Sequence, residues 1–532
     1  MKGYAGFIVV ASCMLCGFFL GTQTIGDRNT IIIESYGNKL DEVFGIIQTN
    51  YVDSTCIDSI IEKCLPEILS ELDPHSVYIP AKDVEETNAD LQSSFSGIGI
   101  RFTIQEDTIH ISDVIRGGPS EKAGILAGDR IITVNDTLFV GKDICTNETA
   151  IKKLKGPKGS FVKIGIQRYG EKDLLDFNIR RDEIPVESIE ASYMIDGKWG
   201  YVQIERFAEN TFAEFIQALA MFIGNNAKGI IIDLRGNGGG YMGIALEMAN
   251  QFLKRDDVIV YTEGEHSVKS IEKANGYGMF QHTPLVILVD ETSASASEII
   301  AGTIQDNDRG TIIGRRTFGK GLVQQPFELG DGSMMRLTIA RYYTPSGRCI
   351  QKPYTKGEKE KYDMDLLDRY NRGEFFSQDS IHQNVDEIHK TRKGRTVYGG
   401  GGIMPDIFVA SDTVDHTSYS QEAFSRGLIS RFSLKYSEQN RPTLSQYKGY
   451  EELTRYLDTQ PILESFVEYA AKKGLKKRNN LIAKSRDILT RSIYSNIIYQ
   501  MQGMLEHVKY INLQDPTVLK AIEVLEKGEA FP

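Results

Sequence analysis

The stretch Glu291-Thr-Ser-Ala-Ser-Ala-Ser-Glu298 joins a predicted strand to a predicted helix. The apolar run Pro284-Leu-Val-Ile-Leu-Val289 predicts a buried strand before it, and Ser297-Glu-Ile-Ile-Ala-Gly302 predicts the start of a helix after it. Small residues at such a junction bring a hydroxyl, backbone N–H groups and a helix N-terminus to one point. An acyl-transfer site needs that combination, because its nucleophile must lie beside donors for the developing oxyanion.

The candidate nucleophile, Ser295, needs a general base, and Lys320 is the residue that the sequence offers. None of the eight histidines lies in the Ser295 segment or in Thr317-Phe-Gly-Lys-Gly-Leu-Val-Gln324. Lys320 stands among glycines and an aromatic residue between two apolar runs, where partial burial would disfavour its charged form. The pattern therefore indicates a serine/lysine dyad.

Ser295 also has a purely structural interpretation. Ser295-Ala-Ser-Glu298 fits a capping box, in which the serine satisfies the first backbone amides of the helix. Taken alone, the segment favours this role, because serine is common at helix N-caps. The motifs elsewhere in the chain favour catalysis.

Length and composition exclude several classes of protein. At 532 residues the chain is too long for one core, and its length suggests about three or four domains. It carries 61 basic and 72 acidic residues, a formal charge of -11, which argues against a general nucleic-acid binder. No His/Cys spacing suggests zinc, so we expect neither a metal nor another cofactor.

The first 24 residues predict an export segment. An apolar stretch runs from Ala5 to about Gly21, Lys2 precedes it, and no charge follows before Asp27. A spanning helix needs about 20 apolar residues, so the length is marginal. The lack of a clear cleavage site favours a retained signal anchor over a cleaved signal peptide, and a lipoprotein start at Cys13 ranks third. Each alternative places the bulk of the chain outside the cytoplasm.

Residues 35 to 90 predict a helical segment, and residues 91 to 170 predict a module of short strands. The second segment resembles a PDZ domain. Its Gly97-Ile-Gly-Ile100 stretch resembles the loop that presents backbone N–H groups to a chain-terminal carboxylate, so Gly97, Ile98, Gly99 and Ile100 are the candidate peptide-binding residues. The alternative is a glycine-rich turn that only supports a sheet.

From Trp199 onward the sequence alternates between strand and helix patterns. Lys228-Gly-Ile-Ile-Ile-Asp-Leu234 predicts a buried strand, and Arg235-Gly-Asn-Gly-Gly-Gly240 predicts a loop that opens a helix. A glycine loop before a helix also suggests phosphate binding, but Tyr241 stands where the dinucleotide fingerprint needs its third glycine. An oxyanion-hole loop needs the same exposed amides and fits equally well.

The rest of the chain divides into a core and peripheral segments. Residues 171 to 350 form the predicted α/β core, to which residues 397 to 412 return. Residues 351 to 396 are a polar insertion that we expect to be exposed to solvent, and residues 417 to 532 predict a helical region. His75 is a lone loop histidine, for which we expect no catalytic role.

Taken in order, these segments resemble the C-terminal processing peptidases, also called tail-specific proteases. The resemblance covers about residues 35 to 350, with a further match at Gly401-Gly-Ile-Met-Pro-Asp406. The motifs that carry it are Asp233-Leu-Arg-Gly-Asn-Gly-Gly-Gly240, Ser293-Ala-Ser-Ala-Ser-Glu-Ile299, Gly314-Arg-Arg-Thr-Phe-Gly-Lys-Gly-Leu-Val-Gln324 and Tyr342-Tyr-Thr-Pro-Ser-Gly-Arg348. Together they are far more specific than any one of them.

The resemblance implies a role for each site residue. Ser295 corresponds to the nucleophile, Lys320 to the general base and Gln324 to the residue that holds the lysine. The oxyanion donors are then the amide of Ala296 and one of Gly239 or Gly240. The loop Gly-Asn-Gly-Gly-Gly departs from the family's usual Asn-Asn-Pro-Gly-Gly.

The implied fold is multidomain α/β, a ClpP/crotonase-like protease core with an inserted PDZ domain, an N-terminal helical segment and a C-terminal helical region. The implied activity is that of a serine endopeptidase of the cell envelope, anchored in the inner membrane facing the periplasm or secreted to the periplasm. The implied partners are protein substrates with free C-termini, together with an activating adaptor protein and further copies of the chain. No nucleic-acid partner is expected.

Two other functions compete with this one. A non-catalytic PDZ scaffold on a protease-like core is the nearer alternative, and the intact Ser295/Lys320 pair argues against it. A crotonase-like acyl-CoA enzyme also uses glycine-loop amides as an oxyanion hole. The export segment and the PDZ resemblance argue against that enzyme.

Overall fold

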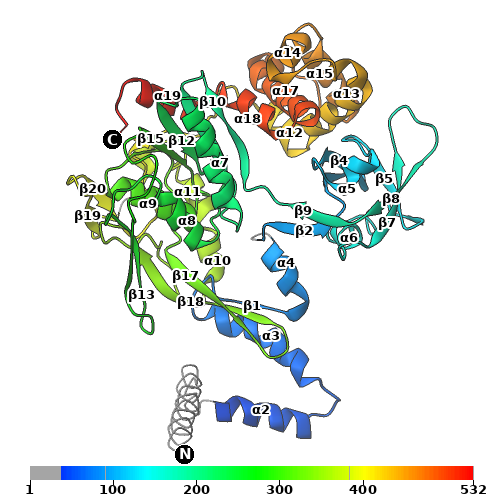
Figure 1. The fold of residues 1–532 in the computed structure, drawn as a ribbon. Coiled ribbons are helices and arrows are strands. Elements are labelled where there is room, and N and C mark those ends of the chain that lie inside the picture. Colours follow the sequence, from blue (N-terminus) through cyan, green and yellow to red (C-terminus); the bar gives the residue numbers. More distant parts are fainter. Residues whose placement is uncertain (1–36, 90–91, 383, 531–532) are drawn as a thin grey trace, which may run out of the picture. The chain divides into compact units, whose positions relative to one another are not determined.

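The computed structural model describes residues 37–89, 92–382 and 384–530 (Figure 1). It divides into two compact units, Met1–Ile68 and Leu69–Pro532. The first contributes α2 (Gly37–Asn50) and most of α3 (Ile57–Ser70). The predicted signal anchor or signal peptide lies outside the described residues. In the part of the chain that is described, no helix has the length and apolarity to cross a membrane.

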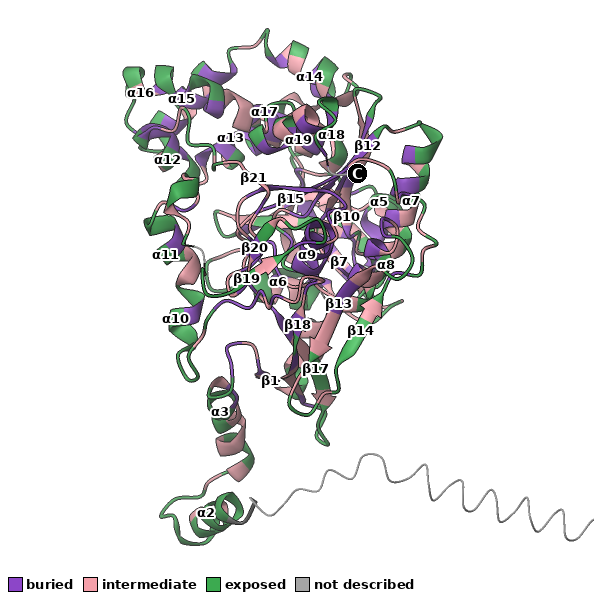
Figure 2. Cartoon of the chain, turned by 90° about the vertical axis from the view of Figure 1, so that its left-hand side faces the viewer, coloured by how far each residue is buried: buried purple, intermediate pink, exposed green. Residues whose placement is uncertain are grey.

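A six-stranded sheet forms the centre of the second unit. Its order is β10-β11-β12-β15-β16-β21, parallel from β11 onward, with β10 antiparallel at one edge. The strands are β10 (Ile189–Ile195), β11 (Trp199–Ile204), β12 (Gly229–Asp233), β15 (Leu285–Val289), β16 (Thr311–Gly314) and β21 (Ile407–Phe408). Both β12 and β15 are buried along their whole length, which explains their continuous apolar sequence (Figure 2).

Helices cover both faces of this sheet. On one face lie α7 (Thr211–Gly224), α8 (Met242–Ala249) and α9 (Ala296–Asp306), and on the other lies α19 (Pro516–Glu526). The alternation along β12 fits this arrangement, because Ile230 and Ile232 join the cluster with α7 to α9 whereas Ile231 joins that of α19. The chain therefore has the predicted mixed α/β core.

A second sheet lies beside the core and carries Gln324. Its order is β1-β18-β13-β14, and β17 also pairs with β18. The strands are β1 (Val77–Ile79), β13 (Val258–Glu263), β14 (Ser270–Lys273), β17 (Leu322–Glu328) and β18 (Met334–Tyr343). Between β1 of this sheet and the PDZ module lie the short elements η1 (Ala81–Asp83) and α4 (Val84–Ala89).

The PDZ module is a separate sheet with its own apolar core. Its order is β3-β4-β5-β7-β8, and β2 pairs with β9 at the point where the chain enters and leaves it. The elements are β2 (Ser94–Gly97), β3 (Ile100–Gln105), β4 (Thr108–Val114), α5 (Pro119–Ala123), β5 (Arg130–Val134), β6 (Thr137–Leu138), α6 (Asn147–Leu154), β7 (Phe161–Gln167), β8 (Leu175–Arg180) and β9 (Asp182–Pro185). The module thus continues past residue 170, where we expected it to end, because the polar turn after β7 joins two strands of the same sheet.

Most described residues of the insertion 351 to 396 are exposed, as we expected, but the segment is folded and buries a few polar side chains. It contains α10 (Lys359–Asp363), α11 (Asp365–Asn371), η2 (Gln378–Ser380), β19 (Ile388–Lys390) and β20 (Thr396–Tyr398). Tyr362, Arg369 and Glu374 are buried. Arg369 Nε pairs with Glu374 Oε1 at 2.9 Å, and its other nitrogens donate to the carbonyl oxygens of Arg316 and Thr317. Ion pairs and hydrogen bonds thus anchor a segment whose other residues mostly face solvent.

The C-terminal region is helical, as predicted. Seven helices of this region enclose a separate apolar cluster. They are α12 (Ser418–Ser425), α13 (Leu428–Leu444), α14 (Gly449–Leu457), α15 (Ile462–Lys472), α16 (Asn479–Lys484), α17 (Arg486–Gln502) and α18 (Met504–Asn512). The last helix, α19, returns to the central sheet, where Asp515 at its N-cap accepts from Arg235 beside the glycine loop.

Candidate active site

Ser295 lies between β15 and α9, as its sequence context predicts. It is the N-cap residue of α9, with a φ of 55° and a ψ of -113°. A positive φ is uncommon for a residue with a side chain, and such strain, of about 1–3 kcal/mol, concentrates at functional sites. The first amides of α9 have no acceptors within the helix and point toward this end. The turn therefore presents a hydroxyl beside the N–H of Ala296, whereas the N–H groups of Ser297 and Glu298 donate to the carbonyl oxygens of Ala294 and Ser295.

The glycine loop that follows β12 packs directly on this turn. A Cβ at Gly239 would lie 2.7 Å from Ser295 Cβ and 2.8 Å from the carbonyl oxygen of Ala294, so only glycine allows the approach. A Cβ at Gly240 would lie 2.2 Å from the carbonyl oxygen of Phe207. The close contact explains why this loop is rich in glycine.

The three candidate oxyanion donors are not equivalent. Gly239 N–H already donates to Asn237 Oδ1 at 2.8 Å, inside its own loop. Ala296 is the first residue of α9, so its N–H has no acceptor within the helix. Among the described residues, Gly240 N–H makes no hydrogen bond. Gly240 and Ala296 are therefore the candidate donors whose N–H groups have no acceptor among the described residues, and Gly239 allows the close approach to Ser295.

Asn237 holds the glycine loop in place, a role that we did not predict. Its Nδ2 donates to the carbonyl oxygen of Ile204 at 2.8 Å. Its own carbonyl oxygen accepts from Ala294 N–H and from Ser297 Oγ, each at 3.0 Å. An asparagine inside a glycine run was the available signal, since a buried side chain there must find polar partners. Ser297, the third serine of Ser293-Ala-Ser-Ala-Ser297, therefore braces the loop.

The amine of Lys320 is held by the predicted Gln324. Lys320 Nζ donates to Gln324 Oε1 at 3.0 Å, and Gln324 Nε2 donates to the carbonyl oxygen of His75 at 2.5 Å. Burial lowers the pKa of Lys320 from its ordinary value of 10.5, and the guanidinium of Arg336 lowers it further. The neutral amine that a general base requires is thus favoured at this position.

The loop of residues 73 to 76 contributes to the site, although we expected no catalytic role for His75. Asp73 Oδ1 accepts from the backbone N–H groups of His75 and Ser76, at 2.8 and 3.0 Å, and from Thr338 Oγ1 at 3.0 Å. His75 Nε2 lies 2.9 Å from the Tyr362 hydroxyl. Burial lowers the pKa of His75 to about 4, and the nearby Lys320 contributes to this shift. The loop therefore fixes the His75 carbonyl that holds Gln324. The imidazole of His75 is neutral at neutral pH.

Glu298 connects the two halves of the site. Its Oε2 accepts from the backbone N–H groups of Ser295 at 2.9 Å and Lys320 at 2.8 Å. Its Oε1 accepts from Gly319 N–H at 2.7 Å and Thr317 Oγ1 at 2.6 Å. Complete burial raises the pKa of Glu298 to about 7, against these four hydrogen bonds, which lower it. The glutamate of the predicted capping box thus also fixes the lysine loop.

Tyr342 forms a second connection between these segments. Its hydroxyl lies 2.6 Å from the carbonyl oxygen of Lys320 and 3.1 Å from that of Ser295. The side chain is almost completely buried. Because the same two residues are joined through their N–H groups by Glu298 and through their carbonyls by Tyr342, their separation is fixed from both sides.

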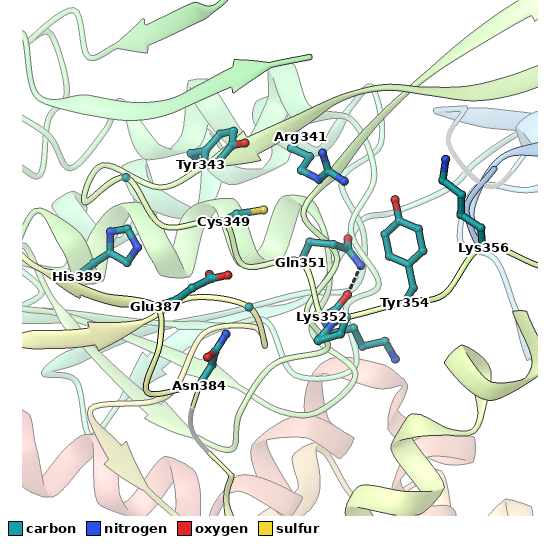
Figure 3. A pocket seen from close by; sticks show the side chains of 13 residues that line it. Arg341, Tyr343, Cys349, Gln351, Lys352, Tyr354, Lys356, Asn384, Glu387 and His389 are labelled. Atoms are coloured by element: carbon teal, nitrogen blue, oxygen red, sulfur yellow. Dashed lines mark hydrogen bonds between the residues drawn. The ribbon is translucent and has the colours of Figure 1, made fainter. Parts of the chain in front are cut away.

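The site opens into a cavity of about 820 Å³, which is lined by Ser295, Lys320, Gln324 and the glycine loop. Arg336 and Tyr342 of β18 line it as well. A second cavity, of about 660 Å³, is lined by Arg341 and Tyr343, which are odd-numbered residues of the same strand (Figure 3). Successive side chains of a strand point to opposite faces, so β18 separates the two cavities.

The predicted peptide-binding loop belongs to the PDZ module and does not line the cavity of Ser295. Gly99 has a φ of 76°, and the carbonyl oxygens of Ile98 and Gly99 accept from Ser120 and Ile115. The strand that follows, β3, is at the edge of its sheet. Among the described strands none pairs with its outer edge, which is the arrangement that addition of a peptide strand requires.

Comparison with known proteins supplies the family. Residues 198–358 match Peptidase family S41, and residues 96–179 match the PDZ domain. The chain is 33% identical to the carboxy-terminal processing protease CtpA of Bacillus subtilis (strain 168), over 71% of this chain and 79% of that protein. The chain belongs to peptidase family S41. It is a serine-type peptidase of the carboxy-terminal processing group, with the protease core and PDZ domain that its sequence predicts.

This S41 peptidase also resembles other proteins, over different fractions of their length. It is 34% identical to CtpB of the same organism, over 59% of this chain and 65% of that protein, so the match spans just under two thirds of that relative. The solved structure of a photosystem II D1 C-terminal processing protease is 27% identical, with a TM-score of 0.34, over 58% of this chain and 89% of that one. Residues 419–503 match a family of unknown function.

Proposed function

We propose that this S41 peptidase is a serine endopeptidase that recognises the C-terminal tails of proteins through its PDZ domain and cleaves them with a Ser295/Lys320 dyad. The observation that carries the assignment of the dyad is the shared acceptor Glu298 Oε2, which binds Ser295 N–H at 2.9 Å and Lys320 N–H at 2.8 Å. Both residues also line one cavity with the glycine loop. A purely structural capping serine would need neither the lysine nor the cavity.

In this proposal the neutral amine of Lys320 takes the proton of the Ser295 hydroxyl as its oxygen attacks the scissile carbonyl. The developing oxyanion accepts hydrogen bonds from the N–H groups of Gly240 and Ala296. Lys320 then returns the proton to the leaving amine, and the acyl-enzyme remains on Ser295. Water deprotonated by Lys320 hydrolyses the ester, and Gln324 keeps the amine oriented throughout.

The pH dependence of active-site labelling tests the dyad. We expect a fluorophosphonate to modify Ser295 in the full-length protein, with a rate that rises with pH as Lys320 loses its proton. Because burial and Arg336 lower the pKa of Lys320, the midpoint should lie below 10.5. Mass spectrometry of the labelled peptides locates the adduct. An adduct on Ser293 or Ser297, or a midpoint at the ordinary lysine value, would contradict the assignment.

The PDZ domain should bind the terminal carboxylate of the substrate. Amidation of a peptide with an apolar C-terminal residue removes the negative charge that backbone N–H groups of the Gly97–Ile100 loop would bind. We therefore expect amidation to lower kcat/KM by roughly tenfold, because charge-assisted hydrogen bonds contribute about 1.5–3 kcal/mol. The measurement is a comparison of cleavage rates for the free-acid and amidated peptides. Equal rates would mean that the module only braces the core.

The proposed location is the cell envelope. The apolar stretch from Ala5 to about Gly21, preceded by Lys2, supports a retained anchor in the inner membrane with the protease in the periplasm, and a cleaved signal peptide would release it there. An activating adaptor and a homo-oligomer are further proposals that rest on the sequence resemblance alone. Extraction of the protein with carbonate or with detergent distinguishes the anchored form from the secreted one.

A further inference from the structure

Arg336 lines the cavity of Ser295 and Lys320. It belongs to β18, opposite Pro326 of β17 and Val77 of β1. Its side chain is half-buried. Among the described residues, no carboxylate lies within ion-pair distance of its guanidinium, and no side-chain or backbone acceptor bonds to it. A half-buried charge without a partner is costly, so its presence needs an explanation.

Other arginines of the core show how the fold treats such groups. Six of them pair with carboxylates at 2.6–2.9 Å: Arg235, Arg315, Arg316, Arg348, Arg369 and Arg395. Arg309 instead donates to the carbonyl oxygens of Phe252, Phe280 and Thr283. Arg336 thus differs from these arginines, because it lines an open cavity and no acceptor in the described part of the chain bonds to its guanidinium.

The charges around the cavity favour an anion there. Among the described residues that line it, Glu205 carries the only carboxylate, and Glu205 pairs with Arg206 at 2.7 Å. The remaining charged groups are Lys320 and Arg336, so the cavity has an excess of positive charge. The planar fork of an arginine matches the two oxygens of a carboxylate.

We propose that Arg336 binds a carboxylate of the bound substrate close to the scissile bond and makes the enzyme prefer substrates that carry one there. The proposal rests on the proposed protease function and adds a specificity determinant to the same cavity. The carboxylate belongs either to an aspartate or glutamate side chain or to the chain terminus of a substrate that is cut near its end. The PDZ loop is a separate site for the terminal carboxylate, because it does not line this cavity.

Paired peptides test the proposal and distinguish the two sources of carboxylate. The first set is amidated at the C-terminus and carries aspartate or asparagine in turn at each position near the scissile bond. The second set lacks acidic side chains and varies the distance from the scissile bond to a free or amidated terminus. We expect a preference for the acid of about ten- to hundredfold in kcat/KM, mainly through KM, at one position or one distance.

Variants of two arginines on one strand provide the matched comparison. Arg336→Gln should reduce the preference to about one, and Arg336→Glu should reverse it in favour of a lysine at the same position. Arg341 is the control, because it lies on the same strand but lines the other cavity (Figure 3). Arg341→Gln should therefore keep the preference of the wild-type protein. Thermal unfolding of each variant separates loss of recognition from loss of fold.

The pH dependence of cleavage provides a second readout, because nearby charges affect the pKa of Lys320. The charged groups that act on its amine are Arg336, which lowers its pKa, and Glu298 and Asp73, which raise it. Arg336→Gln should shift the midpoint of the pH–rate profile to higher pH, and Arg341→Gln should not. If the wild-type protein cleaves the asparagine peptides but prefers no acid at any position or distance, the role of Arg336 is overturned and the dyad stands. If it cleaves no peptide, the proposed function and this inference fall together.

Discussion

Replacing Ser295 with alanine should abolish peptide hydrolysis while the protein stays folded. Ser295 lines the cavity beside Lys320 and adopts a strained backbone conformation that a capping role does not require. Loss of a nucleophile leaves only binding and the oxyanion donors, so kcat should fall at least about 10³-fold. Lys320→Met should cause a similar loss because it removes the base. The measurements are peptide cleavage and thermal unfolding of the full-length protein.

Ser293 and Ser297, the two serines that flank Ser295, provide the controls. Ser293 Oγ donates to the carbonyl oxygen of Leu234 at 2.8 Å, and Ser297 Oγ donates to that of Asn237 at 3.0 Å. Both side chains are completely buried. Their replacement by alanine should cost about 1 kcal/mol of stability through a lost hydrogen bond, with a far smaller effect on kcat. If Ser293→Ala were as inactive as Ser295→Ala, or if Lys320→Met kept its activity, the dyad would be wrongly assigned.

The sequence identifies those parts of the site that lie on local motifs. The Ser295 turn can be predicted because an apolar strand pattern, a run of small residues and a helix pattern follow one another directly. The glycine loop before α8 can be predicted for the same reason. The setting of Lys320, among glycines and an aromatic residue between two apolar runs, indicates the base, and family resemblance adds Gln324 in the same motif. The family, its protease core and its PDZ domain are confirmed by the comparisons.

Contacts between distant segments could not be predicted from local patterns. Gln324 is fixed by the carbonyl of His75, 249 positions away, and a backbone acceptor leaves no mark on the side-chain pattern. The insertion of residues 351 to 396 is mostly exposed, and its composition does not reveal that Arg369 and Glu374 pair inside the protein. Asn237 and Glu298 fit ordinary loop and capping patterns, which conceals their second roles.

Glu298→Ala should have the largest effect of any substitution outside the dyad. The side chain is completely buried and accepts four hydrogen bonds from Ser295, Thr317, Gly319 and Lys320. Alanine leaves these donors without an acceptor, and each buried unsatisfied group costs about 1–3 kcal/mol. We therefore expect a loss of several kcal/mol in the free energy of unfolding, measured by chemical denaturation, and a loss of activity because the serine and lysine segments are no longer tied together.

Glu298→Gln separates the charge of this side chain from its shape. Burial raises the pKa of Glu298 from 4.5 to about 7, so the folded state binds the proton more tightly than the unfolded state does. Its contribution to stability is then fully present below pH 4.5 and is lost as the pH rises through about 7. Activity should change in the opposite direction, because only the deprotonated carboxylate can accept all four hydrogen bonds that tie the serine and lysine segments together. In Glu298→Gln this group no longer titrates. The stability of the wild-type protein relative to this variant should therefore decline between pH 4.5 and about 7, and a constant difference across that range would show that Glu298 is ionised throughout.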